Sequence, residues 1–378
     1  MDVLTDLLHR ARAQNALVRR LIRRPPWGMA YADAPPLTVA ATLGGHAWIR
    51  VAGGVPTRLA AGDIALVTAP GGYTIADDAA TAPEFVIRDG RKYLPTGAPA
   101  PAHPMPAPRT YGADMSQADA AEAGAAEAGA AGGDAAGAGR SGAGLPGVTV
   151  MLRGAYELRG DVAARLLELL PPLAVVPAGP RTRTALELLS AEAARDEPGQ
   201  DAVLARLLDL VLVIALRAWC TRPEATPPAW YRALGDPSIG EALRLLHDDP
   251  AHRWTVASLA AEVGMSRAAF ARRFTALVGR PPLGYLTDWR MTLAADLLRD
   301  TRHSVATVAR RVGYQDPFAF SVAFRRARGR TPSAWRVPAS EASTLAINPP
   351  AGAAPAGSRE AGSREAGSRD RRPGRPRP

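Results

Sequence analysis

The side chains with the clearest chemical meaning are arginines on two short predicted helices in the C-terminal third of this 378-residue chain. Arg267, Arg272 and Arg273 lie on the first helix, and Arg325 and Arg326 lie on the second. A guanidinium group donates paired hydrogen bonds to the edge of guanine, and it also neutralises phosphates. Both helices are therefore candidates for contact with a nucleic acid.

These two helices belong to an internal repeat within residues 255–332. In each copy a shorter helix comes first, with apolar residues at i, i+3, i+4 and i+7, and Thr255 or Ser304 is suited to cap it. A glycine then ends this helix and opens a tight turn. The repeat predicts two helix-turn-helix motifs, at about 255–278 and about 304–328.

The second helix of each motif has a buried face and a free face. Ser266 and Asp316 are suited to cap these helices, and two phenylalanines four residues apart anchor each of them to the core. The opposite face carries Arg267, Ala268, Ala271 and Arg272 in the first copy, and Phe318, Ala319, Ser321, Val322 and Arg325 in the second. A linking helix over about 283–299 would hold the motifs apart. A separation near one DNA turn, roughly 34 Å, would let both second helices enter successive major grooves.

The net charge of +10 is concentrated toward the C-terminal end. Residues 236–336 contain 16 arginines and nine acidic residues, whereas residues 1–235 sum to zero. Residues 337–378 add seven arginines against four acids and are rich in Pro, Gly and Ser, so we expect a disordered basic tail. A net-basic folded segment followed by a basic tail favours a polyanionic partner.

Residues 1–180 predict a β-rich domain. A helix is expected at 2–22, because its leucines repeat at helical spacing. Short apolar segments broken by Gly and Pro predict strands at 38–43, 46–51, 64–68, 85–87 and 148–152. Residues 112–147 are nearly all Ala, Gly, Asp and Glu, and we expect them to form a disordered loop within this domain.

Residues 161–170 and 181–219 predict helices with apolar faces. We expect 181–222 to be a helical dimerisation or linker segment, with a homodimer contact through 181–220. The predicted fold class is thus α+β multidomain. It combines a β-barrel or sandwich N-terminal domain with an all-α C-terminal domain at 236–336 that contains the two motifs.

A signature runs through both copies of the repeat and the helix between them. Its residues are Ser266, Phe270, Arg272, Arg273, Phe274, Gly279, Pro282, Tyr285, Leu286 and Arg290, then Val305, Val308, Ala309, Val312, Gly313, Tyr314, Phe320, Phe324, Gly329, Thr331 and Pro332. This signature resembles the DNA-binding domain of the AraC/XylS family, and it covers residues 236–336. The resemblance implies a regulator that binds double-stranded promoter DNA.

In that family the second helix of each motif reads base edges. The resemblance therefore implies base reading by Ala268, Ala271 and Arg272 in the first motif, and by Phe318, Ala319, Ser321 and Val322 in the second. Arg267 is added as a candidate for base or phosphate contact, and Arg273, Arg325 and Arg326 are the expected phosphate contacts.

The two reading faces are expected to differ. Arg272 is the expected hydrogen-bonding reader of a base, with guanine as its default partner. Phe318 and Val322 can only contact thymine methyl groups or pack, so specificity should depend mainly on the first motif.

The N-terminal part resembles the cupin-like sensor domain of some family members. The segment from Trp48 to Val51, a turn, and the segment from Arg58 through Gly62 and Asp63 to Leu66 carry this resemblance. It implies sensing of a small-molecule effector whose identity stays open. Trp27, Tyr31, Trp48 and Tyr73 are candidates to line an apolar pocket, although such aromatic residues are more often core.

No metal, other cofactor or enzymatic activity is expected, because His46 stands alone among the predicted strands and a metal site needs three or four ligands. The single cysteine, Cys220, is either a buried thiol or a redox sensor that pairs between subunits. The sequence shows no signal peptide and no membrane span, so a cytoplasmic location is expected.

The resulting prediction is a cytoplasmic, effector-responsive transcription regulator of promoter DNA, with RNA polymerase as a candidate partner. An activator is the favoured form, although the sequence leaves open whether transcription is raised or lowered. Two alternatives stay open. In the first, the β domain only dimerises and binds no effector. In the second, a cupin enzyme is fused to a DNA-binding module.

Overall fold

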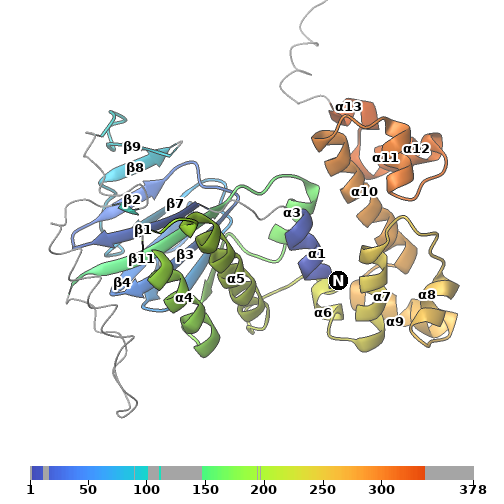
Figure 1. Cartoon of the computed structure of the whole chain (residues 1–378), viewed down its shortest axis with the longest axis horizontal. Helices are drawn as coiled ribbons and strands as arrows, with labels where there is room; N and C mark the ends of the chain where they lie inside the picture. Colours follow the sequence, from blue (N-terminus) through green and yellow to red (C-terminus); the bar gives the residue numbers. More distant parts are fainter. Residues whose placement is uncertain are drawn as a thin grey trace, which may run out of the picture. The chain divides into compact units, whose positions relative to one another are not determined.

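The computed structural model describes residues 2–11, 17–88, 90–100, 110–111, 147–193, 195 and 197–336 of the chain (Figure 1). The expected tail at 337–378 and nearly all of the expected loop at 112–147 lie outside these residues. In the part of the chain that is described, no helix is long and apolar enough to cross a membrane.

The described strands form two six-stranded sheets. From edge to edge, the first sheet contains β10 (Thr110–Tyr111), β1 (Leu17–Arg23), β11 (Thr149–Tyr156), β3 (Leu37–Gly44), β6 (Ile64–Val67) and β12 (Leu173–Val176). The second contains β5 (Thr57–Ala60), β4 (His46–Val51), β7 (Tyr73–Ala76), β2 (Gly28–Tyr31), β8 (Phe85–Arg88) and β9 (Arg91–Tyr93). Neighbouring strands are antiparallel, except that β1 with β10 and β2 with β8 are parallel.

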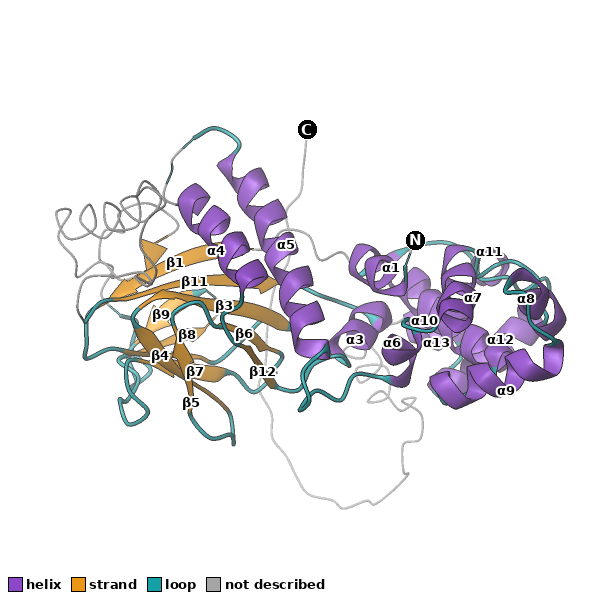
Figure 2. Cartoon of the chain, turned by 90° about the horizontal axis from the view of Figure 1, so that it is seen from below, coloured by secondary structure: helices purple, strands orange, loops and turns teal. Residues whose placement is uncertain are grey.

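The first sheet is covered on both faces, which explains why β6 is apolar along its whole length and why β3 is buried at nearly every position. Val39 and Leu66 pack in one cluster with residues of the helices α4 (Pro180–Ala193) and α5 (Gln200–Cys220) (Figure 2). Their neighbours Ala40 and Ala65 pack in a second cluster with residues of the other sheet, such as Ile49. This alternation follows from the period of two along a strand. The structure confirms the β-rich sandwich. It also confirms the helical segment predicted at 181–219, which forms α4 and α5.

Helix α5 lies close to the first sheet because of a glycine. A Cβ atom on Gly154 of β11 would overlap the side chain of Leu208 of α5. The phenol of Tyr156, also on β11, donates a hydrogen bond of 3.1 Å to Asp209. The contact therefore combines a buried leucine, which contributes about 1.5–3 kcal/mol, with one polar bond at its edge.

The predicted helix at 2–22 is wrong in its second half. Helix α1 covers only Val3–Arg10, and Leu17–Arg23 forms strand β1. Strand β1 pairs along its full length with β11, in the register Leu17 to Ala155 and Arg23 to Thr149. The backbone hydrogen bonds of this ladder outweigh the weak helical spacing of the leucines, because propensity is only a weak prior. The sequence also did not predict strands β2, β5, β7, β9, β10 and β12.

The C-terminal part is helical. Its elements are α6 (Ala229–Ala233), α7 (Pro237–Asp248), α8 (Val256–Glu262), α9 (Arg267–Val278), α10 (Pro282–Asp300), α11 (Val305–Arg311), α12 (Pro317–Arg328) and α13 (Pro332–Arg336). Both predicted helix-turn-helix motifs are present, as α8 with α9 and as α11 with α12. The linking helix is α10.

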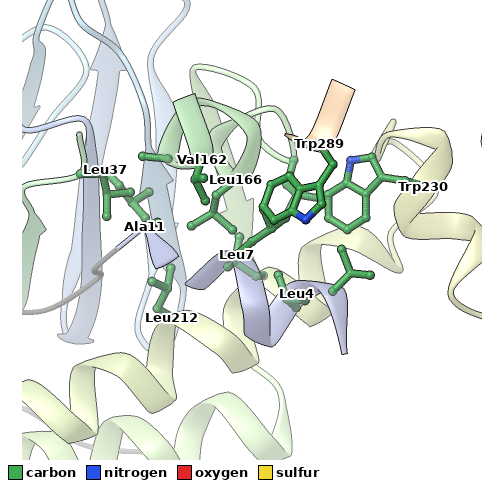
Figure 3. Packing of buried hydrophobic residues seen from close by; sticks show 14 of the residues in the cluster. Leu4, Leu7, Ala11, Leu37, Val162, Leu166, Leu212, Trp230 and Trp289 are labelled. Atoms are coloured by element: carbon green, nitrogen blue, oxygen red, sulfur yellow. The ribbon is translucent and has the colours of Figure 1, made fainter. Parts of the chain in front are cut away.

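Helices α1 and α3 (Asp161–Leu167) pack against α7 and α10. Figure 3 shows Leu7 of α1 and Leu166 of α3 beside the ring of Trp289. Polar contacts accompany this packing, because the carboxylate of Asp296 accepts hydrogen bonds of 2.7 and 3.1 Å from the backbone N–H groups of Asp161 and Val162. Two segments from the first half of the chain therefore complete the core of the C-terminal helices.

Candidate nucleic-acid interface

Each motif begins with a well-capped helix. The side chain of Thr255 accepts a hydrogen bond from the backbone N–H of Ser258, and the Ser258 side chain accepts one from the backbone N–H of Thr255, which forms a capping box. Ser304 accepts an equivalent bond of 3.1 Å from Thr307 in the second motif. Such a cap contributes about 1 kcal/mol to helix stability. The predicted N-caps of α8 and α11 are confirmed.

The turns depend on glycine. Gly264 and Gly313 have φ angles of +66° and +86°, in the left-handed region that a side chain disfavours. After the turn, Ser266 caps α9 and Asp316 caps α12, as predicted. Pro317 follows Asp316 at the first helical position, where its fixed φ angle and missing N–H are tolerated.

Phenylalanine pairs anchor the second helix of each motif. Phe270 and Phe274 of α9 are fully buried, with ring centroids 5.6 Å apart. Phe320 and Phe324 of α12 are equally buried, and their centroids lie 5.7 Å apart. Because these residues lie at i and i+4, they fix one face of each helix toward the core and turn the opposite face to solvent.

Arg290 of α10 ties the two motifs together. Its Nε donates a hydrogen bond of 2.6 Å to the carbonyl of Pro250, and its Nη2 donates one of 2.8 Å to the carbonyl of His252. The guanidinium also lies 5.8 Å from the ring of Tyr314, in the turn of the second motif. Burial lowers the pKa of Arg290, which nevertheless stays charged. One side chain thus joins the segment before α8 to the turn before α12.

The free face of α9 carries the residues predicted for the first motif. Arg267, Ala268 and Arg272 are exposed, and Ala271 is half-buried. Arg273 lies beside this face, where its Nε donates a hydrogen bond of 2.9 Å to Asp236, the N-cap of α7.

The contact between Arg273 and Asp236 is an ion pair with consequences for both groups. The hydrogen bond from Arg273 lowers the pKa of Asp236, and the same bond raises the pKa of Arg273. A phosphate that binds Arg273 would therefore compete with a carboxylate already in place.

The free face of α12 carries the residues predicted for the second motif. Phe318 and Val322 are 76% and 56% exposed, Ala319 is exposed, and Ser321 is half-buried. The hydroxyl of Ser321 donates a hydrogen bond of 2.8 Å to the carbonyl of Pro317, so its proton is already engaged.

Further arginines near the motifs were not identified from the sequence. The expected phosphate contacts Arg325 and Arg326 are exposed on the last turn of α12. Arg253 and Arg302 are also exposed, and each stands two residues before the N-cap of the first helix of a motif. Their equal positions in the repeat were a signal that could have indicated them. Arg328, by contrast, is held in an ion pair of 2.8 Å with Asp161.

The N-terminal domain contains a small cavity between its sheets. Its lining consists of Arg19, Leu21, Tyr31, Ala40, Tyr73, Ile75, Met151 and Arg153. The rings of Tyr31 and Tyr73 stack with centroids 4.8 Å apart, and the guanidinium of Arg153 lies 4.2 Å from the Tyr31 ring. Of the four aromatic residues considered from the sequence, only Tyr31 and Tyr73 line this cavity, whereas Trp27 is fully buried in the core.

Cys220 lies at the end of α5 and is partly buried. Burial raises the pKa of its thiol to about 11, although a hydrogen bond with Tyr231 opposes this shift. A thiol with so high a pKa is a poor nucleophile at neutral pH, which disfavours a redox role. Within the described ranges, no group of three or more His, Cys, Asp or Glu residues is arranged to hold a metal ion.

Comparisons with known proteins agree with this arrangement. A family model described as Cupin matches residues 2–221, and one described as a helix-turn-helix domain matches residues 259–337. A protein of Streptomyces antibioticus that is named as an AraC-like transcription regulator is 32% identical over 342 residues, which is 89% of this chain and 98% of that protein. This chain belongs to the AraC family.

As a member of the AraC family, the chain is a DNA-binding transcription regulator with a cupin N-terminal domain. The regulator AlkR of Acinetobacter baylyi is 34% identical over 177 residues, which is 45% of this chain and 58% of that protein. The solved DNA-binding domain of AdpA, in complex with a target DNA, is 34% identical and covers 30% of this chain and 99% of that chain, with a TM-score of 0.27.

Proposed function

We propose that this AraC-family regulator binds promoter DNA sequence-specifically, with α9 and α12 as the recognition helices in successive major grooves. The observation that carries this proposal is the pairing of buried and free faces on α9 and α12. Each helix is anchored by two buried phenylalanines and exposes the opposite face, and α10 joins the two motifs. The relatives from Streptomyces and Acinetobacter are bacterial proteins, and bacterial DNA lies in the cytoplasm, so this function also supports the expected cytoplasmic location.

Selection of bound sequences from a randomised duplex library tests the proposal directly. We expect the full chain to enrich two short half-sites about one DNA turn apart. Enrichment of no sequence, or of a single half-site that tolerates every spacing to its neighbour, would contradict binding through two helices.

Arg272 is proposed to read a guanine in the first half-site. Arg272→Ala should weaken binding of the selected duplex by about 1–3 kcal/mol and relax the preference at one base pair. Arg183→Ala removes an exposed arginine from α4 and serves as the matched control. Equal effects of the two variants on affinity and preference would refute the role of Arg272.

Helix α5 supports the proposed homodimer. Val203 and Leu210 are exposed and Leu207 and Ile214 are half-buried, so the four form a stripe at the i, i+4, i+7, i+11 spacing of a helix pair. Leu188 of the preceding helix, α4, is also exposed. Two copies of this stripe would bury each other.

Sedimentation velocity tests the homodimer. We expect Leu210→Glu to convert dimer into monomer, whereas Val55→Glu, at an exposed turn residue far from α5 in sequence, should leave the dimer intact. A wild-type protein that sediments as a monomer at micromolar concentration would argue against this contact.

An effector site is proposed between the sheets, where Tyr31 and Tyr73 meet two arginines around a cavity with room for about one water molecule. Binding of an effector there therefore requires these side chains to move apart. A thermal-shift screen should find compounds that raise the melting temperature of the wild type but not of Tyr73→Trp, which fills the cavity. Finding none would favour the alternative in which the β domain only dimerises.

Contact with RNA polymerase is part of the proposal, and transcription from the selected promoter with purified polymerase tests it.

A further inference from the structure

Helix α12 exposes two large apolar side chains on the face that the second motif presents to solvent. Phe318 is 76% exposed and Val322 is 56% exposed. They lie four residues apart and therefore side by side on the helix. Phe320 and Phe324 already anchor α12, so the core does not need either of the exposed residues.

The surroundings of this apolar pair are cationic. Arg325 lies one turn further along the same face, and Arg326 and Arg330 are exposed close by. An occupant that fits must present apolar groups within an anionic frame. The major groove of DNA does so wherever thymine occurs, because the C5 methyl group of thymine projects into the groove between two phosphate backbones.

The internal repeat supplies a comparison within the same molecule. At an offset of 50 residues, Phe318 corresponds to Ala268, and Val322 corresponds to Arg272. In the first motif these positions therefore hold a small residue and a hydrogen-bond donor, both exposed. Equivalent positions on the two helices carry different chemistry, so we expect the two helices to prefer different bases.

We propose that α12 recognises thymine methyl groups through Phe318 and Val322, which makes the operator chemically asymmetric. The half-site under α9 contains the guanine that Arg272 reads, and the half-site under α12 contains thymines read by contact alone. This inference rests on the proposed sequence-specific DNA binding. It also revises the expectation that specificity depends mainly on the first motif.

Replacement of thymine by deoxyuridine isolates the proposed contact, because it removes the methyl group and leaves base pairing unchanged. Burial of one methyl group should change affinity about fourfold, which corresponds to about 0.8 kcal/mol at 25 °C. In the selected duplex, each contacted thymine of the second half-site should therefore weaken binding of the full chain about fourfold when replaced. Replacement in the first half-site should change affinity less than about twofold.

Three variants of α12 and one control variant identify the side chains responsible. Phe318→Ala and Val322→Ala should each bind the thymine and deoxyuridine duplexes with more nearly equal affinity, as a double-mutant cycle measures. Val55→Ala, which truncates an exposed apolar residue of the N-terminal domain, should retain the full difference. Val322→Arg, which copies the first motif, should shift the preference in the second half-site from thymine to guanine.

The outcomes separate the two proposals. If no duplex is bound selectively, the proposed function itself fails. If a selected duplex is bound equally well with thymine and with deoxyuridine, DNA recognition stands and thymine reading is wrong. Thymine reading is also wrong if Phe318→Ala keeps the thymine preference but abolishes transcription with purified polymerase, because the apolar face would then contact a protein.

Discussion

The two turn glycines allow a matched test of how the motifs are held together. Alanine at either position must adopt a left-handed conformation, which costs about 1–2 kcal/mol. At Gly264 a Cβ atom meets nothing within 4 Å, so this is the whole cost. At Gly313 the Cβ would lie 2.7 Å from the carbonyl oxygen of Ala251 and 2.7 Å from Nη2 of Arg290. Such overpacking adds about 1–3 kcal/mol.

We therefore expect Gly313→Ala to destabilise its motif by about 2 kcal/mol more than Gly264→Ala destabilises the other. Hydrogen exchange of the full chain measures this locally, because it reports the opening of α11 and α8 separately. A difference of about 2 kcal/mol means that Gly313→Ala should accelerate exchange of its motif roughly 30-fold more than Gly264→Ala accelerates exchange of the other, each relative to wild type. Equal acceleration in the two variants would refute the close contact between Gly313 and the Ala251 carbonyl.

Three further predictions concern stability. Burial lowers the pKa of His247, so the unfolded chain takes up a proton near pH 6.5, whereas the folded chain does so only at lower pH. The free energy of unfolding should therefore fall as the pH drops from about 7.5 to about 5.5. His247→Gln should flatten this pH dependence. An unchanged slope in urea titrations would contradict this account. Arg290→Lys should lower the free energy of unfolding by about 1–2 kcal/mol, because lysine cannot replace both hydrogen bonds to the carbonyls of Pro250 and His252. An unchanged denaturant midpoint would count against this role of Arg290. Phe320→Ala should lower the free energy of unfolding by about 3–5 kcal/mol. A loss below about 1 kcal/mol in the same urea titration would show that Phe320 does not anchor α12.

The sequence was most informative where interacting residues are close along the chain. The caps of α8 and α12 join residues two or three positions apart, and the phenylalanine pairs lie within one helical turn. Both helix-turn-helix motifs could therefore be predicted to within a few residues. The free face that carries Phe318 was predicted as well, but the sequence left open whether this side chain contacts thymine methyl groups or packs.

Long-range pairing could not be predicted in the same way. Strand β1 is a strand because Leu17 pairs with Ala155, and no local pattern contains that information. The contact between Asp6 and His247 joins residues 241 positions apart. Short strands such as β12 carry too few residues for a clear alternation, and the packing of α5 decides their burial.

The packing of α1 and α3 has a consequence for how this chain can be divided. His247 is fully buried between the carboxylate of Asp6, at 2.9 Å, and the hydroxyl of Tyr285, at 2.8 Å, and it stacks on Trp289. A fragment that starts after α5 would leave this imidazole and this indole without their cover. Such a fragment of the C-terminal helices should therefore be less stable than the same helices in the full chain. A chimaera that joins them to a new sensor should regain that stability if it also supplies two helices that cover Trp289.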